Sequence, residues 1–475
     1  MSASVRRNVA WSMTSIVAKN GCQIVTYMLL ARLLDPSSFG LIAIAMVGMG
    51  LAYSLVDSGF TNVVVRQQSL DRNVLSSLYW FNCSLGILAA ILVAAAGYGA
   101  GAFYHNKELI RLMTTAGVAL ACSACGQQFV AILQRNLSFR IIAVIEIGSS
   151  LGAMAVAVFR ALDGAGPAAY FEGLVVGNAV ASIGAIFFGR TFFFPALRFR
   201  PGEVRKLLQF GLFNTAERCI GYISFNLEKL VMGRLFSLEL LGLYTVVSQL
   251  VTRPVMLFSG AFSRVAYPLY ATLQGEYASL NALYIGYTGK LALMTFPLYG
   301  FFMLFPDTII TLLFGTQFTA AHAFVMPLCI LGSLWSIGNP FGSYLMALNR
   351  AKIGFVFNAA AALLTFTVFI AGSRYSLQIM LWIWVGAVIG ILQPAEWIIR
   401  YRLTGMSAWR YSASFLPHLF VIGALCASIY SFRSLPVDIP ALVKTIMEMA
   451  GFSLVYAGYG ILMYRRYQRQ NTGRA

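Results

Sequence analysis

The sequence has few charged residues. Only 11% of its 475 residues are Asp, Glu, Lys or Arg, against about 25% in a typical soluble domain, and 59% are hydrophobic. Acidic residues are scarcer than basic ones, with 16 Asp and Glu against 34 Lys and Arg. A nucleic-acid-binding protein gathers basic residues on a soluble face, whereas here they lie between apolar segments. The composition therefore predicts an integral membrane protein with no nucleic-acid partner.

Cysteine is also sparse, and the usual cofactor motifs are missing. All seven cysteines lie inside apolar segments, which predicts no disulfide framework. Cys122 and Cys125 have the spacing of a metal or redox pair, but no second pair or nearby His accompanies them, so we interpret them as small packing residues. Gly289-Lys290 lacks the other residues of a phosphate-binding loop. We therefore expect no metal, no cofactor and no ATP-driven step.

Long hydrophilic connections are missing as well. The longest, 190–204 and 273–281, are too short for a soluble catalytic domain. A membrane-embedded enzyme with a sizeable external catalytic loop is therefore not favoured, and we expect no enzyme. Hydropathy predicts an all-α protein with about fourteen spans. They cover residues 9–34, 40–64, 75–103, 110–134, 141–162, 167–189, 205–236, 239–271, 282–305, 322–347, 353–372, 376–399, 411–432 and 439–464.

The basic residues predict an orientation for these spans. If both termini lie on the same side, the connections on that side carry twenty Lys and Arg, against eight on the other side. By the positive-inside rule, both termini are then cytoplasmic and the turn at 35–39 is external. Arg400 is counted with the cytoplasmic set, and Glu396 is expected at the same interface.

Two parts of the sequence share a pattern at an offset of 202 residues, which predicts an internal repeat. Six spans separate the copies, so the repeat is parallel, with a cavity expected between the halves. We predict an N-lobe over 1–190, a cytoplasmic linker over 191–204, a C-lobe over 205–402, and two further spans with a cytoplasmic tail over 403–475. The matching residues are Arg32-Leu33, Gly40-Leu41, Phe60 and Val63 in one copy and Arg234-Leu235, Gly242-Leu243, Phe262 and Val265 in the other.

The first span carries an unusual polar face. A charge at the middle of a membrane helix costs about 2.5–3.5 kcal/mol on insertion scales, so Lys19 is expected to face a cavity or a partner. In the turn that follows, Asp35 is suited to cap the next helix and Pro36 to open it. Intervals of three and four residues bring Ser12, Ser15, Lys19, Gln23 and Thr26 to one face.

The turn after this span resembles a motif of a known family. Residues 32–41, RLLDPSSFGL, are similar to the RLL-x-P-x-x-FG-L turn of bacterial polysaccharide exporters, the lipid-linked oligosaccharide flippases of the multidrug/oligosaccharidyl-lipid/polysaccharide superfamily. Asp57-Ser58-Gly59-Phe60 and Arg66-Gln67 resemble members that export colanic-acid-like polymers. The resemblance implies two six-helix lobes in a V shape, with two extra helices as in lipid II flippase relatives, in the bacterial inner membrane.

The resemblance also implies a function. An undecaprenyl-pyrophosphate-linked repeat unit would pass from the cytoplasmic to the periplasmic leaflet by alternating access, for exopolysaccharide or O-antigen-type biosynthesis. Membrane lipids, a polysaccharide polymerase and glycosyltransferases would be its partners. The main alternative is a cation-coupled multidrug exporter of the same superfamily, whose substrates would require more acidic cavities. The least favoured alternative is a membrane-embedded polysaccharide polymerase or ligase, because such an enzyme needs a sizeable external loop.

Such a substrate needs cations for its phosphates and neutral donors for its hydroxyls. Glu217 and Glu228, beside Arg218 and Lys229 in the seventh span, are interpreted as structural partners. Asp57 and Glu146 are candidates for binding a coupling proton or Na⁺, with pairing to an Arg as the alternative. The predicted cavity residues are Lys19, Gln23, Asn214, Arg218, Asn226, Lys229 and Arg253.

Overall fold

The computed structural model describes residues 3–56, 72–196, 219–434 and 441–472. Every regular element in these ranges is helical, which confirms the all-α prediction. Within these ranges, ten helices are long and apolar enough to cross a membrane, or eleven if the bent pair of α10 and α11 forms one span. The count of fourteen stays a prediction. The chain divides into two compact units, one formed by 1–245 with 311–318 and the other by 246–310 with 319–475.

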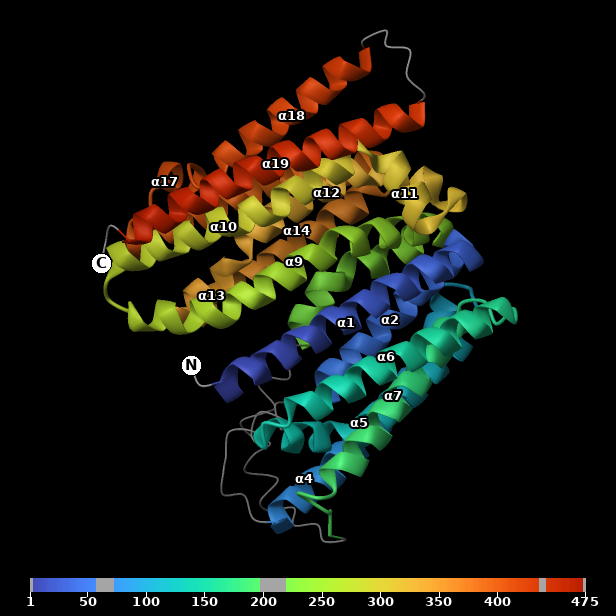
Figure 1. The fold of residues 1–475 in the computed structure, drawn as a ribbon. Helices are drawn as coiled ribbons and strands as arrows, with labels where there is room; N and C mark the ends of the chain where they lie inside the picture. Colours follow the sequence, from blue (N-terminus) through green and yellow to red (C-terminus); the bar gives the residue numbers. More distant parts are fainter. Residues whose placement is uncertain (1–2, 57–71, 197–218, 435–440, 473–475) are drawn as a thin grey trace. The chain divides into compact units, whose positions relative to one another are not determined.

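The first unit is a bundle in which α5 takes a central place. It packs against α2, α4 and α7, while α6 packs against both α7 and α1 (Figure 1). Residues 219–235 are helical, and the unit also holds the start of α9. The bounds are α1 Ala3–Leu33, α2 Pro36–Val56, α4 Arg72–Phe103, α5 Glu108–Arg135, α6 Phe139–Leu162, α7 Ala168–Gly189 and α9 Leu238–Thr272.

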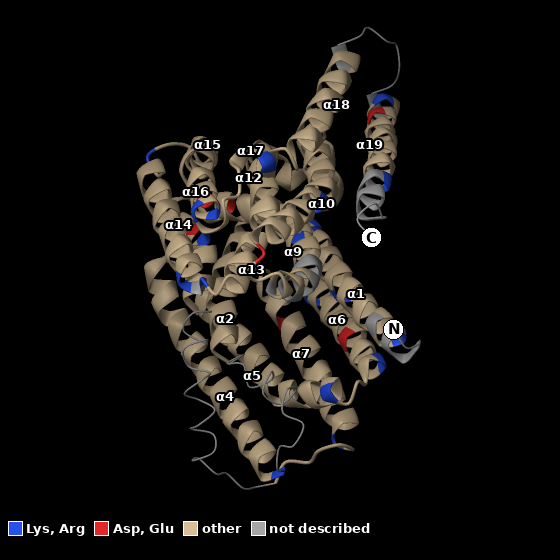
Figure 2. Ribbon diagram, turned by 90° about the vertical axis from the view of Figure 1, so that its left-hand side faces the viewer, with Lys and Arg blue, Asp and Glu red and all other residues tan. Residues whose placement is uncertain are grey.

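The second unit is built around α10, which contacts α12, α13, α16, α18 and α19. A bend of 92° separates α10 from α11, which begins at Pro306; proline favours the first turn of a helix. Figure 2 shows that charged residues are sparse along the helices and that α16 carries both signs. Its bounds are α10 Tyr277–Leu304, α12 His322–Gly338, α13 Pro340–Ala347, α14 Ala351–Gly372, α15 Leu377–Ala387, π-helix η2 Val388–Leu392, α16 Gln393–Thr404, α17 Ala408–Ser412, α18 Leu416–Ser434 and α19 Ala441–Thr472. Helix α11 Pro306–Phe314 and 3-10 helix η1 Thr316–Ala321 are divided between the units, because residues 311–318 belong to the first.

The turn between α1 and α2 is held by side-chain hydrogen bonds. α2 begins at Pro36 as predicted. The Asp35 carboxylate accepts hydrogen bonds from the hydroxyls of Ser37 and Ser38, the latter at 2.6 Å. Partial burial opposes ionisation, but these hydrogen bonds outweigh it and hold the pKa of Asp35 below its ordinary value. The carboxylate therefore stays charged and fixes the turn at neutral pH.

Segment 311–318 binds the end of α1, where helical carbonyls lack partners within the helix. Arg32 Nη2 donates to the Leu312 carbonyl at 2.8 Å. Gln317 Nε2 donates to the Leu34 carbonyl at 2.8 Å and also to that of Ala31. The Phe39 and Phe318 rings meet edge to face with centroids 5.3 Å apart. A segment from the second half of the sequence therefore forms part of the first unit.

A reciprocal contact joins the two copies of the repeated pattern. A Cβ added at Gly40 would overlap the backbone oxygen of Leu238, and one added at Gly242 would overlap that of Pro36. The predicted offset of 202 relates Pro36 to Leu238 and Gly40 to Gly242. The contact is thus symmetric about the repeat, as at an isologous interface. Glycine is required at both positions because the two helix starts touch backbone to backbone.

Substituting alanine at Gly40 or Gly242 is expected to destabilise the protein by about 1–3 kcal/mol, because the added methyl group meets backbone that cannot rotate away. Gly99→Ala in α4 is the matched control, since nothing lies within 4 Å of its added Cβ. Its melting temperature in detergent should stay the same or rise, given alanine's higher helix propensity. Equal melting temperatures for the Gly40, Gly242 and Gly99 variants would contradict the close helix contact.

The second unit buries an ion pair near the end of the predicted span 376–399. Arg400 is only 1% exposed and Glu396 only 3%, so both charges are surrounded by protein and not by water. Their cytoplasmic side stays a prediction. Arg400 Nη1 lies 3.1 Å from Glu396 Oε1 and donates to the Tyr284 hydroxyl at 2.9 Å. Its guanidinium carbon lies 3.9 Å from the centroid of the Tyr411 ring. Pairing and aromatic stacking compensate for the loss of water around these charges.

Candidate functional site

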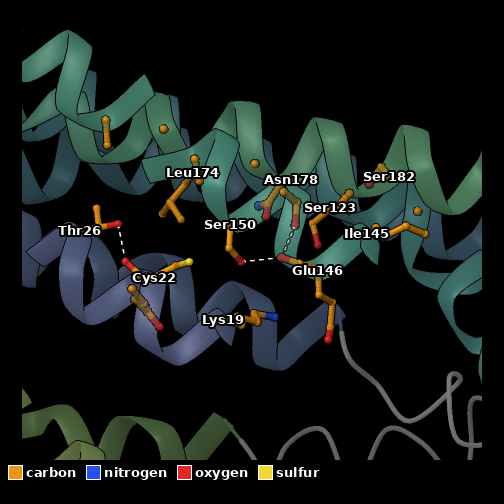
Figure 3. Close-up of a pocket in the computed structure, with 18 of the residues that line it drawn as sticks. Lys19, Cys22, Thr26, Ser123, Ile145, Glu146, Ser150, Leu174, Asn178 and Ser182 are labelled. Carbon is orange, nitrogen blue, oxygen red and sulfur yellow. Dashed lines mark hydrogen bonds between the residues drawn. The ribbon is translucent and has the colours of Figure 1, made fainter. Parts of the chain in front are cut away.

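A polar cavity of about 340 Å³ lies within the first unit, among α1, α5, α6 and α7. One cationic side chain, one anionic side chain and several amides and hydroxyls line it. Figure 3 shows α1 with Lys19, Cys22 and Thr26 on one side and α7 with Asn178 and Ser182 on the other. The polar lining residues are Lys19, Cys22, Gln23, Thr26, Ser123, Gln127, Glu146, Ser149, Ser150, Tyr170, Asn178 and Ser182.

The two charged side chains in the cavity come from different helices. Lys19 is exposed on α1, and Glu146 is half-buried on α6. Within the described ranges, neither side chain has an oppositely charged group within 4.0 Å. An unpaired charge within a membrane bundle is costly and is commonly retained for function. Both charges are thus available to a ligand in the cavity.

The neutral lining groups are oriented by hydrogen bonds to backbone carbonyls. Asn178 Nδ2 donates to the Ala119 carbonyl and the Tyr53 hydroxyl, both at 2.9 Å. Ser182 Oγ donates to the Cys122 carbonyl at 2.6 Å. Each hydroxyl or amide oxygen retains lone pairs for a further hydrogen bond. The lining therefore presents fixed acceptors beside the Lys19 ammonium, which suits a ligand with both hydroxyl groups and negative charge.

The structure brings together three of the predicted site residues, Lys19, Gln23 and Glu146. Asn226 and Lys229 lie elsewhere in the first unit, where Lys229 Nζ donates to Asn226 Oδ1 at 2.9 Å. Glu228 between them is buried. Arg253 belongs to the second unit, where its Nε donates to Gln249 Oε1 at 3.0 Å. Asp57, Asn214, Glu217 and Arg218 lie outside the described residues.

Several lining residues were missed by the sequence analysis, although a signal for them exists. Ser123 and Gln127 on α5 are four residues apart, as are Asn178 and Ser182 on α7. This is the spacing that revealed the polar face of α1. Applied to every span, the same test would have found them. No cluster of His, Cys, Asp and Glu suited to a metal ion occurs among the described residues.

Comparison with known proteins identifies a family and several relatives of this chain. A family described as polysaccharide biosynthesis protein matches residues 29–323. The lipopolysaccharide biosynthesis protein WzxC of Escherichia coli (strain K12) is 29% identical, covering 77% of this chain and 74% of WzxC. The teichuronic acid biosynthesis protein TuaB of Bacillus subtilis (strain 168) is 28% identical, covering 82% of this chain and 81% of TuaB.

The fold is also similar to that of solved structures. The lipid II flippase MurJ in its inward closed conformation superimposes with a TM-score of 0.73, covering 97% of this chain and 99% of MurJ. Sequence identity is 13%, so the likeness concerns the fold. It confirms the predicted all-helical fold, similar to that of the lipid II flippase.

Proposed function

The chain belongs to the polysaccharide biosynthesis protein family, and from that premise we propose that this multi-pass membrane protein moves a lipid-linked oligosaccharide between the two leaflets. The observation that carries the proposal is the polar cavity of the first unit, with an unpaired Lys19 among fixed amides and hydroxyls. The protein is a transporter and not an enzyme. Its substrate class is an undecaprenyl-pyrophosphate-linked repeat unit, moved from the cytoplasmic to the periplasmic leaflet by alternating access.

The chemistry of this substrate matches the lining of the cavity. A pyrophosphate or an acidic sugar is attracted by the Lys19 ammonium, because charge-assisted hydrogen bonds are the stronger kind. Sugar hydroxyls can both donate and accept, so they suit the amides of Gln127 and Asn178 and the hydroxyl of Ser182. The names of the relatives, which concern lipopolysaccharide and teichuronic acid biosynthesis, support a glycan as the cargo.

Glu146 is our candidate for coupling transport to an ion gradient. Its half-buried carboxylate lines the cavity without a cationic partner among the described residues, so it is available to a proton or Na⁺. Asp57 remains a second candidate. Asn214, Arg218, Asn226, Lys229 and Arg253 remain proposed contacts of the substrate at other stages of transport.

We place the chain in the bacterial inner membrane with both termini in the cytoplasm. A polysaccharide polymerase and glycosyltransferases are its proposed partners, since they would supply and consume the lipid-linked unit. A deletion strain should accumulate this unit in the cytoplasmic leaflet, and the wild-type gene should restore its transfer. A second experiment expresses the protein in a drug-hypersensitive strain. Raised resistance to ethidium-like dyes there would support the multidrug alternative and contradict the proposal.

The orientation gives a labelling prediction. In a variant without native cysteines, a cysteine at Ser37 should react with an impermeant maleimide in intact spheroplasts. One at Asn471 should react only after lysis, because the positive-inside rule places the basic C-terminal tail in the cytoplasm. Labelling of Asn471→Cys in intact spheroplasts would overturn this topology.

A further inference from the structure

A large groove in the second unit takes no part in the proposed transport. Its volume is about 1190 Å³, and its walls are the first half of α10, the corner from α16 through α17 to the start of α18, and one residue of α19. Polar residues, two cations and apolar side chains all face it. Among them are Asn281, Leu283, Lys290, Trp409, Arg410 and Met463.

The groove is positively charged. Lys290 and Arg410 line it, and none of its lining residues is acidic. Within the described part of the chain, neither cation lies within 4.0 Å of a carboxylate. The Lys290 ammonium lies 5.5 Å from the centroid of the Tyr287 ring. Arg465, two residues beyond Met463 on α19, is also exposed. Two unpaired cations in one groove favour an anionic ligand.

The groove also offers an apolar surface beside these charges. Leu283, Ile285 and Pro417 line it together with Met463. The Trp409 side chain on α17 is 73% exposed, and exposed tryptophan is typical of the level of lipid headgroups. The long stem of Lys290 lets its ammonium reach that level while the stem lies along apolar surface. A ligand of this groove therefore has an anionic headgroup and a hydrocarbon chain.

We propose that the groove binds an anionic phospholipid of the bilayer, with its phosphate between Lys290 and Arg410 and an acyl chain along Leu283 and Ile285. Basic pockets between membrane helices are suited to such headgroups. The Ser407 hydroxyl supplies a hydrogen bond to a glycerol or phosphate oxygen. Asn281 has one amide N–H left for the same purpose, because its other hydrogen bonds go to Thr404 and Tyr344. This inference does not rest on the proposed function, because the ligand is a resident membrane lipid and not the transported glycolipid.

Native mass spectrometry of the purified full-length protein tests this site. The probes are phosphatidylglycerol, phosphatidylcholine with the same acyl chains, and undecaprenyl pyrophosphate. Lys290→Gln combined with Arg410→Gln should weaken phosphatidylglycerol binding roughly thirty-fold. Each cation near an anionic lipid raises the affinity about five-fold, and the variant lacks two of them. Binding of phosphatidylcholine should not change, which also shows that the variant is folded.

The matched control combines Lys352→Gln with Arg402→Gln, because both side chains are exposed in the second unit and neither lines the groove. Its affinity for phosphatidylglycerol should stay within about twofold of wild type, since surface charges outside a site are largely screened. An equal loss in both double variants would overturn the proposal. So would a wild type without preference for phosphatidylglycerol, or undecaprenyl pyrophosphate displacing that lipid at lower concentration.

Discussion

Replacing Lys19 by glutamine is expected to lower polymer export at least tenfold while the protein still accumulates in the membrane. Lys19 is an unpaired cation in the cavity, and a hydrogen bond to a charged group is worth about 1.5–3 kcal/mol, roughly a ten- to hundredfold change in affinity. Lys19→Arg should retain much of the activity because charge is preserved. Export and membrane abundance should be measured together in a strain that lacks the chromosomal copy.

Two comparisons separate this role from a structural one. Lys107→Gln, at an exposed position before α5 outside the cavity, should export normally. If Lys19 instead paired with Glu146, removing one partner would strand the other, and Glu146→Gln would restore the abundance of the Lys19→Gln protein. We expect no such rescue, because the two groups form no ion pair within 4.0 Å. Normal export by Lys19→Gln alone would refute the headgroup role.

Replacing Arg400 by methionine is expected to destabilise the second unit by about 3–5 kcal/mol, because the Glu396 carboxylate would remain buried without its partner. Adding Glu396→Gln should recover a large part of the lost stability by removing the stranded charge. The measurement is the melting temperature in detergent. Arg402→Gln, an exposed position two residues further along α16, should leave it unchanged. An Arg400→Met single variant with the melting temperature of the wild type would contradict this contribution of the ion pair to stability.

The predictions that succeeded rest on local signals. The turn at Asp35-Pro36 was readable because proline and a capping residue favour the start of a helix. The 202-residue offset was readable from Gly40 and Gly242, whose lack of side chains is what the reciprocal contact requires. α1 is absent from the helices that pass a hydropathy test because its polar face lowers its mean hydropathy. That same face pointed to the cavity.

The buried Arg400 could not be predicted from the sequence in the same way. The positive-inside rule counts every Arg near the end of a span as solvated, but burial depends on what other helices bring to that position. Here α10, α13 and α17 supply Tyr284, Phe341 and Tyr411 around the guanidinium. These aromatic residues lie far apart in the sequence, so no local pattern shows that they meet. The i, i+4 spacing of Glu396 and Arg400 was the one available hint.

Only the residues that α1 contributes to the cavity could be predicted from the sequence, for a related reason. A polar face on one helix shows that a span meets something other than lipid, and this found Lys19 and Gln23. Which other helices share the cavity depends on tertiary packing. The predicted cavity combined residues of the first and seventh spans, whereas the described cavity is lined by α1 together with α5, α6 and α7. Whether the seventh span also faces the substrate stays a prediction.

Transfer of an undecaprenyl-pyrophosphate-linked oligosaccharide in proteoliposomes is the most direct test of the account. The purified protein would be reconstituted with the labelled glycolipid in the outer leaflet, and a membrane-impermeant reagent would report what remains there over time. We predict that wild-type protein and Lys19→Arg protect a growing fraction of the label, while Lys19→Gln protects at least tenfold less per unit time. Vesicles with wild-type protein that protect no more label than protein-free vesicles, or a Lys19→Gln rate equal to wild type, would contradict the account.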